Sequence, residues 1–194
     1  MRLLHSPTSP FACKVMACAI ARGIEERITL VPTSTDNPAL AEHNPLGKVP
    51  CLITDDGAAL FDSRVICEFL DTISDVYPMF PEHGARVRAL RFQALGDGIA
   101  DALVLRRAEG ARPADPARTQ SIAHQTQKVA RSLAFLEQEV PALHVDIGAI
   151  AVACALGYLD LRFAHEPWRA AHPKLAAWYA EIAQRPCLAR TIPG

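Results

Sequence analysis

The stretch N-P-L-G-K-V-P-C-L-I, residues 44–53, places a proline at the start of a short apolar run. Cys51, Leu52 and Ile53 together have the composition of a buried strand. Proline has no N–H to donate to a sheet, and it is normally confined to edge strands or to the first residue of a strand. Pro50 should therefore weaken the pairing of this strand, and we expect another interaction to compensate for it.

The segments around this strand alternate between the two periodicities that are typical of α/β units. Ser9 is a candidate N-cap and Pro10 a first helical residue, and Gly23 ends the helix that they begin. Asp62 is a candidate N-cap for a second helix. The predicted order is βαβ followed by ββα, with strands at residues 3–4, 28–31, 49–54 and 58–61 and a hairpin turn at 55–57.

Strand signals end at a cluster of breakers, Pro78, Pro81 and Gly84. The rest of the chain has helical periodicity, which predicts an all-helical bundle. We therefore expect an α/β domain over residues 1–75, a linker over 76–84 and an all-α domain over 85–194. The helices predicted in the second domain cover residues 85–109, 115–140, 146–163 and 173–184.

Composition excludes several classes of partner. The formal net charge of the 194 residues is −1, so no overall field would attract nucleic acid or an anionic membrane surface. The longest uncharged apolar run, residues 147–159, is shorter than the ~18 residues of a membrane span. The start of the chain lacks the apolar stretch of a signal peptide. These observations favour a cytoplasmic protein with a small-molecule partner.

The cysteines and histidines do not have the spacing of a metal site or of a disulfide framework. Six cysteines are scattered without a C-x-x-C motif, which favours free thiols in a reducing compartment. The seven histidines include no H-E-x-x-H motif or paired spacing. We expect no bound metal.

Three motifs together resemble the cytosolic glutathione S-transferases. They are Ser9-Pro10-Phe11 at the start of the first helix, Gly47-Lys48-Val49-Pro50 before the third strand, and Asp62-Ser63 at the start of the next helix. Their order and separation are more specific than any one of them alone. The resemblance implies a thioredoxin-like βαβ-ββα domain followed by a C-terminal helical bundle, a homodimer, and a detoxification enzyme that uses glutathione as co-substrate.

In that family the proline follows a cis peptide bond, and the equivalent bond here joins Val49 to Pro50. The resemblance implies that the Val49 N–H and C=O point into a cleft, where the cysteinyl backbone of glutathione pairs with them as an added strand. The ligand would then supply the pairing that the proline removes. The alternative is that Pro50 is an ordinary trans residue at the first position of a strand.

The resemblance also implies which residues would bind the charged groups at the two ends of glutathione. Ser63, at a helix N-terminus with unpaired N–H groups, would hold the γ-glutamyl carboxylate. Asp62 would either face the α-amino group or only cap the helix. Lys48 would contact the glycyl carboxylate, although a lysine on a loop is most often solvated, and Phe11 would belong to the same site.

Ser9 occupies the position at which the family carries its catalytic hydroxyl or thiol. The resemblance implies that the Ser9 hydroxyl donates a hydrogen bond to the glutathione sulfur and that the helix terminus favours the thiolate. Thr8 is the second candidate for this role and Ser6 the third. Cys13 lies where similar bacterial members often carry arginine, and we interpret it as a buried spectator thiol because it lies one turn inside the helix.

The second substrate, a small hydrophobic electrophile, is expected against the first bundle helix. Asp97 and Asp101 lie four residues apart on one face of that helix, with Leu105 another turn on, and these residues would line its pocket. The alternative is a solvated acidic stripe.

Two rival functions stay open. One is a non-catalytic module of the same fold that acts as a regulator or stress partner, which need not retain a hydroxyl at Ser9. The other is a thiol-disulfide oxidoreductase, which the absence of C-x-x-C disfavours. The leading prediction is a transferase that binds glutathione, stabilises its thiolate and presents it to the electrophile.

Overall fold

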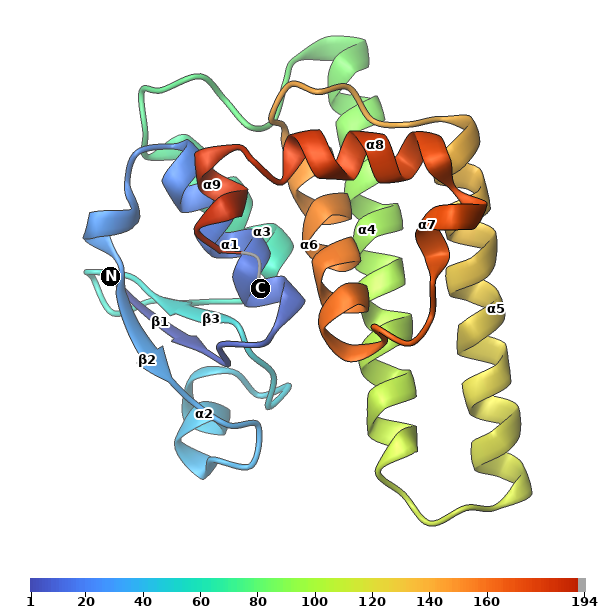
Figure 1. Cartoon of the computed structure of the whole chain (residues 1–194). Coiled ribbons are helices and arrows are strands. Elements are labelled where there is room, and N and C mark those ends of the chain that lie inside the picture. Colours follow the sequence, from blue (N-terminus) through green and yellow to red (C-terminus); the bar gives the residue numbers. More distant parts are fainter. Residues whose placement is uncertain (192–194) are drawn as a thin grey trace.

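The structure of the chain is a computed structural model, which describes residues 1–191 (Figure 1). A small mixed sheet with its helices lies on one side of the molecule, and a bundle of long helices lies on the other. The predicted architecture, a thioredoxin-like α/β part followed by helices, is therefore confirmed. The elements are β1 Arg2–His5, α1 Pro10–Ala21, the 3-10 turn Glu25–Arg27, β2 Thr29–Pro32, α2 Pro38–His43, β3 Cys51–Ile53, β4 Ala59–Leu60, α3 Ser63–Thr72, α4 His83–Gly110, α5 Pro116–Gln138, α6 Ile147–Arg162, α7 Trp168–Ala171, α8 Pro173–Ile182 and α9 Pro186–Ala189.

The sheet has the strand order β2-β1-β3-β4, with β1 parallel to β2 and antiparallel to β3. Side chains alternate between its two faces, as the period of a strand requires. Leu3 and Leu52 face the main core, which also contains α1 and α3. Leu4, Cys51 and Ile53 form a second cluster with Leu40 of α2 on the other face.

Helix α2 is absent from the sequence prediction, which treated residues 32–48 as a polar connection. Its signals are nevertheless present, since the Asn37 side chain accepts a hydrogen bond from the Ala39 N–H and Pro38 is the first helical residue. The single buried side chain of this short helix, Leu40, covers the face of the sheet opposite α1 and α3. The short helices α7 and α9 were missed as well, because a single helical turn has little periodicity to detect.

The bundle is centred on α6, of which residues 147–159 are all buried. It packs so closely against α4 that a Cβ added at Gly96 would lie 2.5 Å from the Ala151 carbonyl carbon. The same applies at Gly148, where a Cβ would lie 2.6 Å from the Ala89 carbonyl oxygen. These two glycines therefore set the distance between α4 and α6, and with it the position of α4 beside the sheet.

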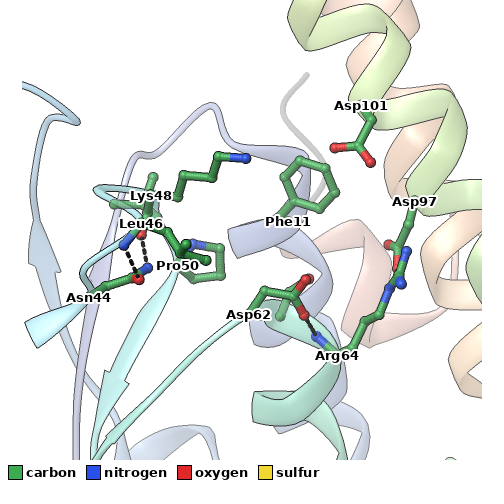
Figure 2. A pocket seen from close by; sticks show the side chains of 11 residues that line it. Phe11, Asn44, Leu46, Lys48, Pro50, Asp62, Arg64, Asp97 and Asp101 are labelled. Carbon is green, nitrogen blue, oxygen red and sulfur yellow. Dashed lines mark hydrogen bonds and ion pairs between the residues drawn. The ribbon is translucent and has the colours of Figure 1, made fainter.

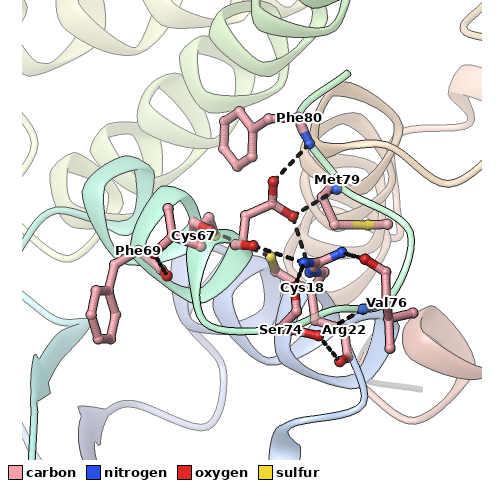
Figure 3. Close-up of polar contacts among 10 residues, drawn as sticks. Cys18, Arg22, Cys67, Phe69, Ser74, Val76, Met79 and Phe80 are labelled. Atoms are coloured by element: carbon pink, nitrogen blue, oxygen red, sulfur yellow. Dashed lines mark hydrogen bonds and ion pairs between the residues drawn. The ribbon is translucent and has the colours of Figure 1, made fainter. Parts of the chain in front are cut away.

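The connection between α3 and α4 is anchored rather than loose. Arg22, whose side chain is 2% exposed, forms an ion pair with Asp71 and donates hydrogen bonds to the carbonyls of Asp71, Ser74 and Val76 (Figure 3). The Asp71 carboxylate accepts from the Met79 N–H. Because both Met79 and Phe80 are buried, the segment predicted as a linker forms part of the core. The exact domain bounds stay a prediction.

Candidate functional site

A cavity of about 120 Å³ opens between the α/β part and helix α4. Figure 2 shows side chains from α1, the loop before β3, the start of α3 and α4 converging on it. All six residues predicted to contact glutathione are among those that line it, together with two residues of the predicted electrophile pocket. The lining residues are Phe11, Asn44, Leu46, Lys48, Val49, Pro50, Asp62, Ser63, Arg64, Asp97 and Asp101.

The loop before β3 is held by Asn44, which is 1% exposed. Its amide nitrogen donates to the Lys48 carbonyl at 2.7 Å, and its side-chain oxygen accepts from the Leu46 N–H at 3.0 Å (Figure 2). Gly47 has φ +59°, a backbone conformation that favours glycine. These features place Lys48 and Val49 in the wall of the cavity.

The peptide bond between Val49 and Pro50 is cis in the structure. Within residues 1–191, neither the N–H nor the C=O of Val49 makes a hydrogen bond. Strand β3 begins at Cys51, directly after the proline, as the sequence predicts. The chain therefore presents one pair of unbonded main-chain groups at the cavity.

The start of helix α3 forms a second wall. Asp62 is the N-cap, and its Oδ1 accepts from the Arg64 N–H at 2.8 Å. Capping, one of the two roles considered for Asp62, is thus present, and it leaves Oδ2 of the same carboxylate for other contacts. Ser63 is 2% exposed and lies in the first turn, where backbone N–H groups lack intrahelical acceptors. A helix start of this kind favours an anionic group, and the Asp62 carboxylate already bonds one of its N–H groups.

A cluster of three charges lies at the cavity wall, in which Lys14 and Asp97 are buried and the Arg64 side chain is 53% exposed. The Asp97 carboxylate on α4 accepts from Lys14 Nζ on α1 at 2.6 Å and from Arg64 Nε on α3 at 2.8 Å. The side chains of Lys14 and Asp97 are 1% and 4% exposed. The hydrogen bond that Arg64 donates to Asp97 raises the pKa of the Arg64 guanidinium above its ordinary value. Asp97 thus joins the bundle to the α/β part.

This arrangement corrects the prediction for α4. Asp97 is not part of a solvated stripe, because two cations hold its carboxylate in the interior. Leu105 is 49% exposed and is not among the lining residues, so the three positions do not form one pocket wall. Asp101 does line the cavity, and burial, followed by the charge of Asp97, raises the pKa of its carboxyl group.

Ser9 lies at the start of α1 but is not among the residues that line the cavity. It is the N-cap, and its Oγ accepts from the Ala12 N–H at 3.3 Å. A hydroxyl that accepts one bond still has its own hydrogen to donate. Of the two competitors, Ser6 lines a different cavity, beside Cys13.

Sequence reasoning missed three residues of this site: Lys14, Asn44 and Arg64. A signal for Lys14 exists, since it is the only charged residue between Ser9 and Ala21 and a charge inside a buried helix requires a partner. The partner lies 83 residues away in the chain, beyond the reach of any local pattern.

Two further findings concern the described residues alone. They contain no group of three or more His, Cys, Asp or Glu side chains that is arranged to hold a metal ion. No helix among them combines the length and the apolar character that crossing a membrane requires.

Comparison with known families gives two matches within the chain. The family model described as "Glutathione S-transferase, N-terminal domain" matches residues 8–73. The model described as "Glutathione S-transferase, C-terminal domain" matches residues 119–181. The first match begins after β1 and runs from the start of α1 to the end of α3, so it includes the cavity residues from Phe11 to Arg64. The second match covers most of α5 and α8 and all of α6 and α7.

Relatives match over the whole length. A glutathione transferase family member from Pseudomonas fluorescens Pf-5, solved with bound glutathione, is 44% identical, with 100% of this chain and 98% of that chain covered and a TM-score of 0.93. A glutathione S-transferase from Methylobacillus flagellatus KT with glutathione bound is 38% identical, with coverage of 100% and 99% and a TM-score of 0.89. The uncharacterized GST-like protein YibF of Escherichia coli K12 is 36% identical, with 100% of this chain and 98% of that protein covered.

Proposed function

This chain belongs to the glutathione S-transferase family, and from that premise we propose that it binds glutathione in the cavity beside α4, stabilises its thiolate and presents it to a small hydrophobic electrophile. The proposal rests chiefly on the way the cavity gathers the Val49 main chain, the start of α3 and Lys48 from separate parts of the sequence. Solved relatives with glutathione bound support it.

The Val49 main chain is the proposed anchor. Its N–H and C=O make no hydrogen bond within residues 1–191, and Val49 lines the cavity. The amide and carbonyl of the cysteinyl residue of glutathione would pair with them, which is strand addition on the scale of one residue. This pairing orients the tripeptide and therefore decides where its sulfur lies.

The charged ends of glutathione would find complementary groups. The γ-glutamyl carboxylate would lie at the start of α3, where it meets the Ser63 hydroxyl, backbone N–H groups and the guanidinium of Arg64. Asp97 holds Arg64 through Nε, so the two terminal nitrogens of that side chain remain for the ligand. Lys48 would meet the glycyl carboxylate, and Asp62 or Asp101 the α-amino group.

We assign the chemical role to Ser9. Its hydroxyl would donate to the glutathione sulfur, and the positive end of α1 would add to the effect. Lowering a thiol pKa by about 2 from its usual ~8.5 takes about 2.7 kcal/mol. A hydrogen bond to a charged group contributes about 1.5 to 3 kcal/mol, so these two effects suffice. Thr8 is the second candidate.

A Ser9→Ala variant tests this role, with Thr8→Ala as the matched control. The rate of conjugation to a chlorinated nitroaromatic should fall at neutral pH in Ser9→Ala and recover as the pH approaches the ordinary thiol pKa. Thr8→Ala should keep the wild-type profile. An unchanged rate and pH profile in Ser9→Ala would remove Ser9 from the mechanism.

The rival function, a glutathione-binding module without catalysis, has one observation in its favour: Ser9 caps α1 and does not line the cavity. Retention on immobilised glutathione together with turnover of the nitroaromatic supports the transferase. Retention without turnover supports the module.

A homodimer is proposed from family membership. Large apolar side chains are exposed on α3 and α4, among them Val65 at 48% and Val87 at 69%. In the proposed dimer a second copy of the chain would cover these side chains. Detoxification as the physiological role and a cytoplasmic location stay predictions.

A further inference from the structure

Two cysteine thiols meet where the α/β part packs on the bundle. Cys13 of α1 and Cys154 of α6 are 141 residues apart in the chain, and their sulfur atoms are 3.1 Å apart. A disulfide needs a sulfur–sulfur distance of about 2.05 Å, so the two atoms have to approach by about 1 Å. A displacement of that size is within the range of small side-chain adjustments.

Cys13 is the accessible member of the pair. It is 8% exposed and lines a second cavity of about 490 Å³, whose wall also includes His5, Met16 and Arg190. This cavity shares no lining residue with the proposed glutathione cavity. Cys154 is 3% exposed and is not among the residues of this wall, so a small oxidant reaches Cys13 first.

The two thiols also differ in acidity. The hydrogen bond with Cys154 lowers the pKa of Cys13, and its contact with Thr191 acts in the same direction against the opposing effect of burial. Burial raises the pKa of Cys154 well above its ordinary value. The thiolate is the reactive form of cysteine, so Cys13 has the character of an attacking sulfur and Cys154 that of a resolving thiol.

We propose that Cys13 and Cys154 form a reversible disulfide when a hydroperoxide oxidises Cys13. The Cys13 thiolate attacks the peroxide oxygen, the O–O bond breaks, and the products are a sulfenic acid on Cys13 and water or an alcohol. The Cys154 sulfur then attacks the sulfenic sulfur, the S–O bond breaks, and hydroxide leaves with the proton of Cys154 as water. Each sulfur loses one electron overall, and the peroxide takes up both.

This disulfide would join the α/β part to the bundle covalently, and it departs from the sequence interpretation of Cys13 as a spectator. It is independent of glutathione binding because Cys13 lies in a different cavity. A second cysteine pair provides an internal comparison: Cys18 and Cys67, close together in Figure 3, are both 0% exposed. The hydrogen bond with Cys67, followed by burial, raises the pKa of Cys18, so this thiol should not react.

The test treats the reduced, folded wild-type protein with a small molar excess of hydrogen peroxide. The protein is then unfolded in the presence of an alkylating agent, digested and mapped by mass spectrometry without reductant. The expected product is one cross-linked peptide pair that contains Cys13 and Cys154 and disappears on treatment with dithiothreitol. Cys18 and Cys67 should be alkylated as free thiols.

Variants separate the two steps. Cys154→Ala should give no cross-link, and its Cys13 should be captured as a sulfenic acid by dimedone. Cys18→Ala, the matched control, should form the cross-link as the wild type does. Three results for the wild type would overturn the proposal, whether or not glutathione binds. Cys13 could stay unmodified, it could be oxidised to sulfinic acid without a cross-link, or it could pair with a different cysteine.

Discussion

The ion cluster of Lys14, Arg64 and Asp97 at the cavity wall contributes to the stability of the fold, and we expect the loss of stability to depend on which of its members is replaced. Asp97→Asn keeps the shape of the side chain but removes the negative charge, so the Lys14 ammonium, 1% exposed, loses its one carboxylate partner among the described residues. The Phe11 ring, 6.0 Å from Nζ, compensates little. Removing one partner of a buried ion pair lowers the free energy of unfolding by about 3 to 5 kcal/mol. Because the asparagine oxygen still accepts a hydrogen bond, we expect a decrease of about 3 kcal/mol for Asp97→Asn.

Lys14→Met should lower the free energy of unfolding by less than Asp97→Asn does. It leaves Asp97 paired with Arg64 at 2.8 Å, and the Arg64 side chain is 53% exposed, so solvent already shares in its hydration. We expect a cost of about 1 to 2 kcal/mol from the loss of the inner pair. The double variant Lys14→Met/Asp97→Leu replaces the pair by apolar groups, and it should be more stable than Asp97→Asn alone.

Urea unfolding followed by circular dichroism measures these differences. With a slope of ~2 kcal/mol per molar urea, Asp97→Asn should lower the midpoint by about 1.5 M and Lys14→Met by about half of that. Arg91→Met, at an ion pair whose side chains are 51% and 38% exposed, serves as the surface control and should stay near the wild type. Equal, small shifts for Asp97→Asn and Lys14→Met would show instead that water reaches this cluster and hydrates the charge that each variant leaves behind.

Three further predictions concern binding, pH dependence and assembly. Ser63→Ala should weaken glutathione binding about 10- to 100-fold in calorimetric titration, the loss of one hydrogen bond to a carboxylate; unaltered affinity would remove Ser63 from the site. Burial is the chief cause that raises the pKa of Asp101 above 3.8 in the folded protein, so ionisation of this group destabilises the folded state as the pH rises past 3.8. Asp101→Asn should therefore raise the free energy of unfolding at pH 7 and leave it unchanged near pH 3. A gain in stability at pH 3 that is absent at pH 7 would contradict this expectation. Val87→Glu should convert a dimer to monomers in sedimentation analysis, and a monomeric wild type would end the dimer proposal.

The sequence predicts the fold well where its signals are local. The caps predicted at Ser9 and Asp62 are both present in the structure. Pro50 leads directly into β3 as the motif predicts. These features depend on residues within one turn of each other, and local patterns record them.

Predictions failed where the decisive partner lies far along the chain. The spacing of Asp97 and Asp101 placed both on one pocket wall, and both do line the cavity, but it gave no sign that Lys14 and Arg64 bind the Asp97 carboxylate. Helical spacing placed Leu105 with them, yet the structure leaves it at the surface. Burial of a charge depends on which helix packs against it, and that information is not contained in the periodicity of one helix.

Calorimetric titration of the folded protein with glutathione is the decisive measurement for this site, because the Val49 main chain, the start of α3 and Lys48 are all proposed to bind this one ligand. We expect saturable binding of one glutathione per chain, and weaker binding in Ser63→Ala. Absence of any heat of binding at millimolar glutathione, in protein whose circular dichroism shows it to be folded, would contradict the proposed binding.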